Sequence, residues 1–234
     1  MNSVTNVKAW DYIVSTKIRI DKFYNTWTKR YIEFDDGFDK FISIYIGYNS
    51  LYEATTRLYL LEGIISYDEY QRKYKRFEIE RASTIMAQLL ESKATTIMRT
   101  QIIRTEIPEI EKIITESNYY FDFRPIDQGL FLNLASQVLP NSNIPNKTIE
   151  KVYEESDDNN LLNSLQSNDP NESLKSLLKL LYKVRCNIFH GNKTYQSEMS
   201  RRVERYADIL NSIYSESYIE WNLLSDELKS KYYS

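Results

Sequence analysis

The segment DPNESLKSLLKLLYKVRCNIFHG, residues 169–191, carries the clearest helix pattern in the chain. Asp169 suits a helix cap, and Pro170 suits the first helical position, where no hydrogen-bonded N–H is needed. Gly191 is placed to end the helix in a left-handed conformation. At roughly 100° per residue, one face collects the apolar side chains Leu174, Leu177, Leu178, Leu181, Val184 and Ile188. The segment therefore predicts one amphipathic helix that runs to His190 and buries this stripe.

Further helices are expected on both sides of this segment, because glycine and proline number only five each. Apolar spacing and helix-end signals predict them over residues 6–32, 36–61, 66–92, 94–117, 129–139, 197–216 and 225–232. Gly63 is placed to end the second of these, and Ser66 with Glu69 forms a capping box that opens the third. Pro108 is expected to break or restart the fourth. Strand patterns are weak throughout, so the sequence predicts an all-α fold.

Two stretches between these helices have the composition of connecting segments. Residues 118–128 are aromatic and irregular, which indicates a loop packed on the core, and residues 147–168 are acidic and polar with short helices. The segment PNSNIPN, residues 140–146, has the composition of a linker. We predict an N-terminal helical extension over 1–35, a helical domain over 36–220 with intervening helices at 63–168 and a linker near 140–147, and a C-terminal tail over 221–234.

The composition excludes several classes of protein. The hydrophobic fraction of 42% and the charged fraction of 27% are typical of a globular chain, and the net charge of −3 gives no overall basic signature of nucleic-acid binding. Any RNA contact must therefore come from a local patch. One cysteine and one histidine exclude the usual zinc clusters, so no metal or other cofactor is expected. Neither a membrane span nor a signal peptide is expected, which makes the cytoplasm the predicted location.

Arg185 and His190 are the candidate site residues of the helix predicted in residues 169–191. Arg185 lies at the edge of the apolar stripe, where a guanidinium needs a partner, so a structural salt bridge is one interpretation. A histidine at a helix end can equally serve as a cap that interacts with the helix dipole. A purely structural pair would make Arg185→Ala unfold the protein by stranding a buried carboxylate.

The two residues together also fit the cleavage of RNA. A planar guanidinium binds phosphate, and an imidazole transfers protons near neutral pH. RNA supplies its own nucleophile, the 2′-hydroxyl, so this chemistry needs no metal. His190 is the single histidine of the chain. Separate acid and base histidines would therefore require a homodimer with the site at its interface.

The segment LYKVRCNIFHGNK, residues 181–193, resembles the signature of the HEPN superfamily, in which four to six residues lie between an arginine and a histidine. The gap here is four residues, and the version of the motif is similar to that of the Apea-like bacterial branch. Residues 38–52 are similar to the first helix of that branch. The resemblance covers residues 36–62 and 172–216, with looser cover between them.

This resemblance implies an HEPN-like up-and-down helical bundle with additional helices. It implies a metal-independent endoribonuclease that dimerises through its motif helices and acts in bacterial defence or as a toxin, with RNA such as tRNA as substrate and an antitoxin or other defence protein as partner. Arg185 would bind the scissile phosphate and His190 would transfer the proton. The alternative is a non-catalytic module of this superfamily that binds RNA, a nucleotide or another protein.

Further residues are carried over with narrower roles. Cys186 occupies the position where many members have a polar residue, and Asn187 could instead orient the imidazole of His190. In the helix over 36–61, Glu53 and Arg57 match a glutamate and a basic residue four positions apart, although ordinary pairing one turn apart explains them equally well. The remaining candidates have a polar or cationic side chain. Lys183, Asn192 and Lys193, in or beside the motif, are candidates for binding RNA, and Asn49, in the helix over 36–61, is a candidate supporting residue.

Overall fold

The computed structural model describes residues 3–116, 163–189 and 197–233. All regular structure in these ranges is helical, so the expectation of an all-α fold is confirmed for them. The four long helices are α1 (Ser3–Glu33), α2 (Gly37–Glu62), α11 (Pro170–Phe189) and α12 (Ser197–Tyr233). The shorter elements are α3 (Tyr67–Glu69), η1 (Tyr70–Tyr74), α4 (Glu78–Glu80), η2 (Arg81–Ile85), α5 (Met86–Leu89), η3 (Glu91–Lys93), α6 (Ala94–Met98) and α7 (Gln101–Glu116).

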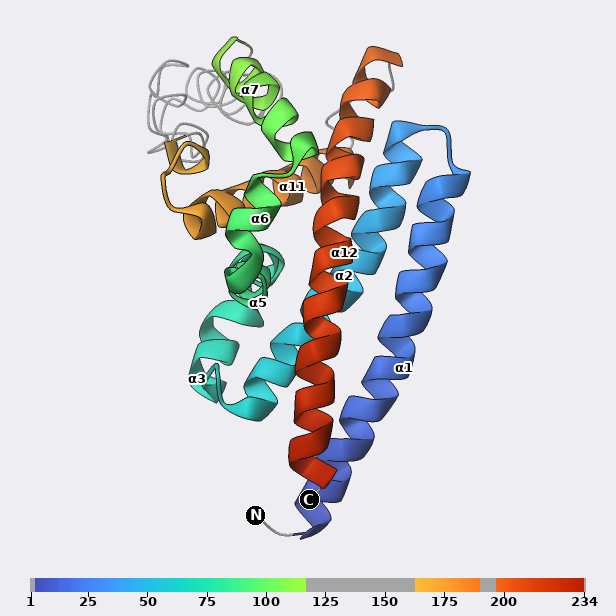
Figure 1. Ribbon diagram of the computed structural model, residues 1–234, viewed down its shortest axis with the longest axis vertical. Helices are drawn as coiled ribbons and strands as arrows, with labels where there is room; N and C mark the ends of the chain where they lie inside the picture. The colour runs from blue at the N-terminus through green and yellow to red at the C-terminus, as the bar shows by residue number, and fades with distance from the viewer. Residues whose placement is uncertain (1–2, 117–162, 190–196, 234) are drawn as a thin grey trace, which may run out of the picture.

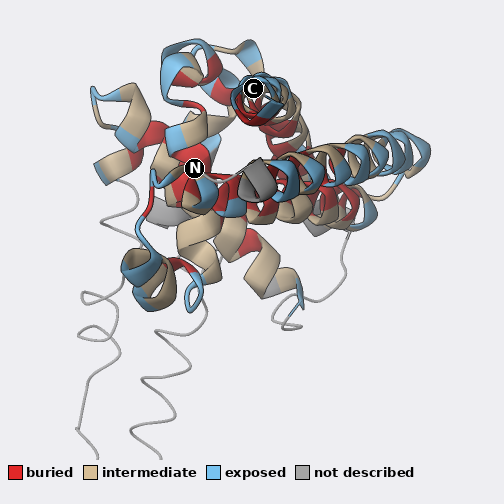
Figure 2. Cartoon of the chain, turned by 90° about the horizontal axis from the view of Figure 1, so that it is seen from below, coloured by how far each residue is buried: buried red, intermediate tan, exposed pale blue. Residues whose placement is uncertain are grey.

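Helices α1, α2 and α12 lie alongside one another and form the longest part of the molecule (Figure 1). Helix α11 lies across the upper half of this layer in the view of Figure 1 and packs on η2, α5 and α6. Buried residues lie where the helices face one another, whereas the outer side of α1 is exposed (Figure 2). No helix in the described ranges is long and apolar enough to cross a membrane.

Both ends of α2 and the start of α3 have the capping residues that the sequence signals. Asp36 caps the helix by accepting from the backbone N–H groups of Phe38 and Asp39. Gly63 ends it with a φ of 72°, a left-handed conformation that glycine adopts without steric cost. Ser66 likewise caps α3 by accepting from the N–H of Glu69 at 3.2 Å, as its capping box predicts.

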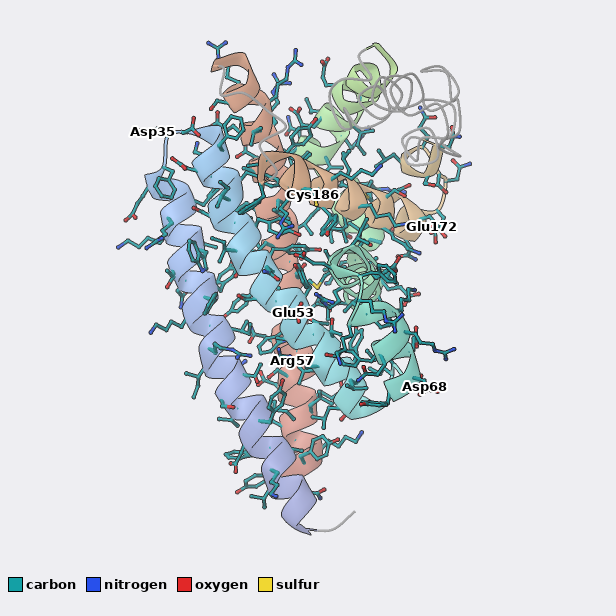
Figure 3. All side chains as sticks on the ribbon, turned by 180° about the vertical axis from the view of Figure 1, so that it is seen from behind. Asp35, Glu53, Arg57, Asp68, Glu172 and Cys186 are labelled. Atoms are coloured by element: carbon teal, nitrogen blue, oxygen red, sulfur yellow. The ribbon has the colours of Figure 1, made fainter. Side chains whose placement is uncertain are left out.

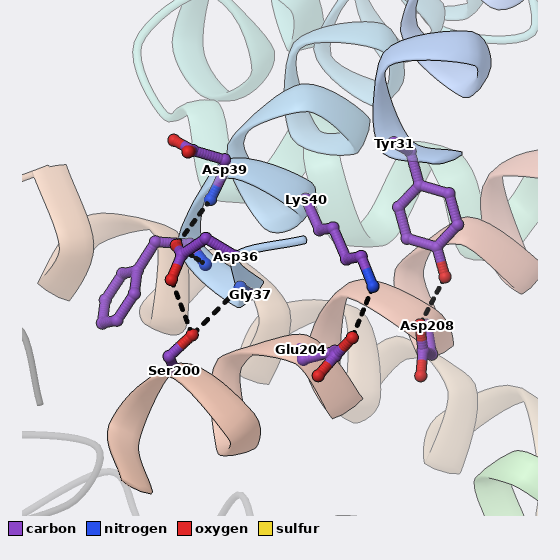
Figure 4. Close-up of polar contacts among 9 residues, drawn as sticks. Tyr31, Asp36, Gly37, Asp39, Lys40, Ser200, Glu204 and Asp208 are labelled. Carbon is purple, nitrogen blue, oxygen red and sulfur yellow. Dashed lines mark hydrogen bonds and ion pairs between the residues drawn. The ribbon is translucent and has the colours of Figure 1, made fainter. Parts of the chain in front are cut away.

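The N-terminus of α2 is joined to α12 by a set of polar contacts (Figure 4). Ser200 Oγ donates to Asp36 and accepts from the N–H of Gly37, while Lys40 pairs with Glu204. The two helices approach so closely that a Cβ atom on Gly37 would lie 2.0 Å from the carbonyl oxygen of Ser200. Only glycine therefore permits this packing of α2 on α12.

The expected helix over 66–92 is wrong, because the chain there is divided into short pieces with two π-helical turns, η1 and η2. Phe77 is extended, with φ −117° and ψ 103°. Side chains bind backbone carbonyls of this region: Tyr48 of α2 donates to that of Ala82 at 2.5 Å, and Arg81, from within the region, donates to that of Tyr74. These tertiary contacts replace part of the regular helical bonding.

Two predicted helix boundaries in other parts of the chain are also wrong. Pro108 lies inside α7 without ending it, and the chain turns earlier, at Arg99 and Thr100. The two helices expected over 197–216 and 225–232 are the single helix α12. Its core face continues through the predicted gap with Ser217 and Trp221, and the buried serine interrupted the apolar pattern in the sequence.

One hydrophobic core joins the long helices. It includes Ile13 and Ile20 from α1, Leu51 from α2, Leu177 from α11 and Trp221 from α12. The predicted division into segments 1–35, 36–220 and 221–234 stays a prediction, but side chains from all three contribute to this core. The loop, helix and linker predicted between residues 118 and 146 lie outside the described residues.

Candidate functional site

The candidate site is built on α11, which begins where the sequence predicts. Asp169 caps the helix by accepting from the N–H of Asn171 at 2.9 Å, and Pro170 is its first residue. The described part ends at Phe189, one residue before His190. The apolar stripe is core as expected, with Leu174, Leu177, Leu178, Leu181 and Val184 at most 1% exposed.

Arg185 lies at the edge of this stripe and contacts groups from two other elements. Its Nη1 atom is 3.6 Å from Oε2 of Glu78 on α4, and the two side chains are 24% and 25% exposed. Its guanidinium carbon lies 4.9 Å from the ring centre of Phe189, 5.6 Å from that of Tyr45 and 5.9 Å from that of Tyr182. Arg185 is therefore a partly buried cation held by one carboxylate and three aromatic rings.

The hydrogen bonding of Arg185 is incomplete. Its Nε atom is shielded from solvent and has no hydrogen-bond partner among the described residues. Its Nη1 atom lies 3.9 Å from the sulfur of Cys186, which is a weak acceptor. Buried donors are nearly always satisfied in folded proteins, so this one indicates a partner that the described residues do not supply.

The electrostatic environment keeps Arg185 charged. Burial by itself lowers the pKa of its guanidinium, but the negative charge of Glu78 and the thiol of Cys186 outweigh this, and the pKa lies above its ordinary value. Burial, followed by the charge of Glu78, raises the pKa of Tyr45. Burial also raises the pKa of Tyr182 to about 12, with Cys186 adding to the effect. Neutral phenols therefore surround a permanent cation at neutral pH.

Glu78 is fixed from its other side. Its Oε1 atom accepts a hydrogen bond from the hydroxyl of Tyr52 at 2.5 Å. Tyr52 and Tyr45 both belong to α2, whose core face packs against η2 and α11. Three elements thus meet at the Arg185–Glu78 pair: α2, α4 and α11.

Glu53 and Arg57 do not form the expected pair along α2. Glu53 instead accepts from Nε of Arg81 on η2 at 2.6 Å. The turn at residues 75–77 brings Arg81 to α2, which the predicted unbroken helix did not allow for. Arg57 is exposed and lines a groove with Asn49, Glu53 and residues of α1.

The other predicted site residues are only partly described. Lys183 lies on α11 and is partly buried. His190, Asn192 and Lys193 lie outside the described residues, as does the side chain of Asn187. The structure therefore places Arg185, Cys186 and Lys183 on one helix and leaves the position of the histidine a prediction.

Sequence reasoning missed the partners of Arg185. Tyr45 and Tyr52 fall in the segment predicted as a helix over 36–61, but nothing in the sequence marks them as neighbours of α11. Glu78 carried no signal, because it falls in a stretch that was predicted to be one helix. Within the described ranges, no three acidic, histidine or cysteine side chains gather as metal ligands would.

Comparison with known proteins adds no family to this description. No family model matches the chain, and neither the curated proteins nor the solved structures provide a match. The class that the structure defines is therefore an all-α protein with a partly buried arginine–carboxylate pair at the end of α11.

Proposed function

We propose that this protein is a metal-independent endoribonuclease of the HEPN type, which cleaves RNA by attack of the 2′-hydroxyl at a site shared across a homodimer. The observation that carries the proposal is the state of Arg185. It is a charged guanidinium, partly buried among aromatic rings, with one N–H that has no hydrogen-bond partner among the described residues, five positions before the single histidine of the chain.

Arg185 would bind the scissile phosphate. A guanidinium presents several N–H groups in one plane, and phosphate oxygens can accept two of them at once. Phe189 is 51% exposed, so one side of the guanidinium lies under a ring that reaches solvent. A base stacked on that ring would bring its phosphate close to Arg185.

His190 would transfer the protons. One proton must leave the 2′-hydroxyl, and one must reach the departing 5′-oxygen, while the phosphate becomes a 2′,3′-cyclic diester. One imidazole per chain suggests that a second copy supplies the other group, so the proposal includes a homodimer. In this proposal the protein acts in the bacterial cytoplasm, in defence or as a toxin restrained by an antitoxin.

The direct test is incubation of the purified full-length protein with tRNA and with total RNA in the presence of a chelator. We expect cleavage products that end in a 2′,3′-cyclic phosphate, and their loss in Arg185→Ala and in His190→Ala. Arg104→Ala is a suitable control, because Arg104 is an exposed arginine on α7. Cleavage by His190→Ala at the rate of the parent protein would refute the proposal.

The shared site has a separate test. Sedimentation equilibrium should show a dimer at the concentrations at which RNA is cleaved. A monomer that cleaves RNA at the same rate per chain over a wide range of concentrations would contradict a site formed by two copies.

A non-catalytic role is the second candidate, and one observation favours it. Glu78 already provides Arg185 with a carboxylate, so a phosphate would have to compete with an internal partner. A module that binds RNA, a nucleotide or a protein would bind without producing cleaved ends. The two candidates differ in their effect on growing cells. If expression of the parent protein arrests growth and expression of the Arg185→Ala/His190→Ala double variant does not, the result favours the ribonuclease.

A further inference from the structure

A groove of about 200 Å³ lies between α1 and α2, away from the Arg185–Glu78 pair. It is lined by Arg19, Phe23, Asn49, Ser50, Glu53 and Arg57. Figure 3 shows Glu53 and Arg57 on α2 with α1 beside them. Asn49 is one helical turn beyond Tyr45, whose ring contacts Arg185, so the groove and the candidate site share helix α2.

The groove carries a positive charge that its own residues do not neutralise. Arg19 and Arg57 come from different helices, both are exposed, and neither has an ion pair within the described part of the chain. Among the described residues, the lining has one carboxylate, Glu53, which is already paired with Arg81 at 2.6 Å. Two arginine charges therefore face the groove without an acidic partner.

A second hollow, of about 440 Å³, lies along the exposed side of α1. It is lined by Lys22, Asn25, Thr26, Lys29, Arg30 and Glu33. Its single carboxylate is 3.5 Å from Lys29, in an exposed pair of the kind that contributes little. The guanidinium of Arg30 lies 4.8 Å from the ring centre of Trp27, which is partly exposed.

Both hollows are lined by residues of α1, with Arg19 and Phe23 in the groove and Lys22 to Glu33 in the second hollow. Together they extend from residue 19 to residue 33, which is about 21 Å at the rise of an α-helix. A single phosphate ion would occupy only a fraction of this length, whereas a polymer with repeated negative charges would contact all of it. Phe23 and Trp27 add aromatic surface on which bases can stack.

We infer that Arg19, Lys22, Lys29, Arg30 and Arg57 form a track, here named the α1 basic track, that binds the phosphate backbone of single-stranded RNA. The inference rests on the proposed function in naming RNA as the polymer. The net charge of the chain is −3, so this concentration of cations is local and opposes the overall charge. The α1 basic track would bind one part of an RNA strand while another part of the same strand reaches Arg185.

The test measures binding separately from cleavage. Fluorescence anisotropy with a labelled 20-nucleotide oligouridylate is recorded over a series of salt concentrations, using the full-length His190→Ala protein to prevent cleavage. The test variant adds Arg19→Ala and Arg57→Ala. A matched control adds Arg99→Ala and Arg104→Ala, two exposed arginines at the junction of α6 and α7.

We expect the test variant to bind at least about tenfold more weakly and the control to bind within about twofold of the parent. Each lost phosphate contact reduces the slope of log affinity against log salt by about 0.7 for a single strand, so the slope should fall by about 1.4 in the test variant. Thermal melting followed by circular dichroism checks that both variants are folded, and exposed side chains without ion pairs should permit this.

Two results would overturn the inference: binding by the test variant with the affinity and salt slope of the parent, or no binding of the oligouridylate by the parent. Equal, track-dependent binding of polyglutamate would also overturn it, since the track would then recognise any polyanion. Track-dependent RNA binding by a protein that never cleaves RNA would uphold the track and reject the ribonuclease.

Discussion

Arg185 on α11 and Glu78 on α4 form an ion pair at 3.6 Å that connects two parts of the chain far apart in sequence. The pair lies against the ring of Tyr45, and the hydroxyl of Tyr52 holds the other oxygen of the carboxylate. Because both members are largely shielded from water, their attraction is screened less than that of a surface pair. The candidate site is therefore also a contact that holds α11 to the rest of the bundle.

This double role predicts a measurable coupling between the two residues. Glu78→Gln retains an acceptor for Tyr52 but removes the charge, and Arg185→Met removes the opposite charge at similar length. Each single variant should lower the free energy of unfolding by about 1–2 kcal/mol, and the double variant should lose about 1 kcal/mol less than the sum. Urea unfolding measures all four proteins, and strictly additive losses would show that the pair contributes nothing.

Arg185→Lys separates the structural role from binding of a phosphate. Lysine retains the charge beside Glu78 but cannot present two N–H groups in a fixed plane. We expect stability to stay within about 1 kcal/mol of the parent and RNA cleavage to fall by about tenfold or more. Initial cleavage rates and a melting curve provide the two values. Unaltered cleavage would mean that the planar group is not needed.

Buried tyrosines predict a loss of stability at alkaline pH. Burial raises the pKa of Tyr59 to about 12, and burial together with a hydrogen bond to Glu69 raises the pKa of Tyr74 to about 12. Unfolded tyrosines lose their protons near pH 10, so above that pH the unfolded chain holds fewer protons than the folded chain. The stabilisation present below pH 10 therefore decreases as the pH rises towards 12.

The measurement follows phenolate absorbance and helical circular dichroism together during an alkaline titration. We expect a late group of tyrosines to ionise in the same pH range in which the helical signal is lost. Complete ionisation of all tyrosines near pH 10 with the helices intact would contradict the burial of these side chains.

Gly37→Ala should destabilise the junction of α2 with α12. The added methyl group would meet the backbone at Ser200 and Glu204, at 2.0 and 2.7 Å, and backbone cannot move aside as a flexible side chain can. We expect a loss of about 2–3 kcal/mol in the free energy of unfolding. Gly63→Ala provides a comparison, because it meets no atom within 4 Å and costs only its left-handed conformation, about 1 kcal/mol. The reverse order of the two losses would argue against the close approach of the helices.

Pro108→Ala is expected to stabilise the protein. Pro108 is exposed inside α7, where proline removes a backbone hydrogen bond and crowds the preceding turn. Alanine restores that bond, and the gain should be about 1–3 kcal/mol. Urea unfolding checks this value against Glu109→Ala, an exposed neighbour whose effect should stay within about 0.5 kcal/mol. A loss of stability in Pro108→Ala would indicate that the helix is built around a bend there.

The sequence by itself determined the features that depend on neighbouring residues. Asp169 and Pro170 begin α11 and Gly63 ends α2 where local capping predicts, because each signal acts within one helical turn. The apolar stripe of α11 likewise places Arg185 at the edge of the core, because the period of the helix alone decides which residues share a face.

Only the tertiary structure decided which groups Arg185 meets and where several helices break. The turn at residues 75–77 brings the segment that follows it against α2 and α11. Glu78 therefore contacts Arg185 of α11, and Arg81 takes the place of Arg57 as the partner of Glu53 on α2. Side chains hold the backbone on both sides of that turn, because Arg81 donates to the carbonyl of Tyr74 and Tyr48, distant in sequence, donates to that of Ala82. Ser217 and Trp221 similarly keep α12 continuous by packing into a core that the local pattern does not reveal.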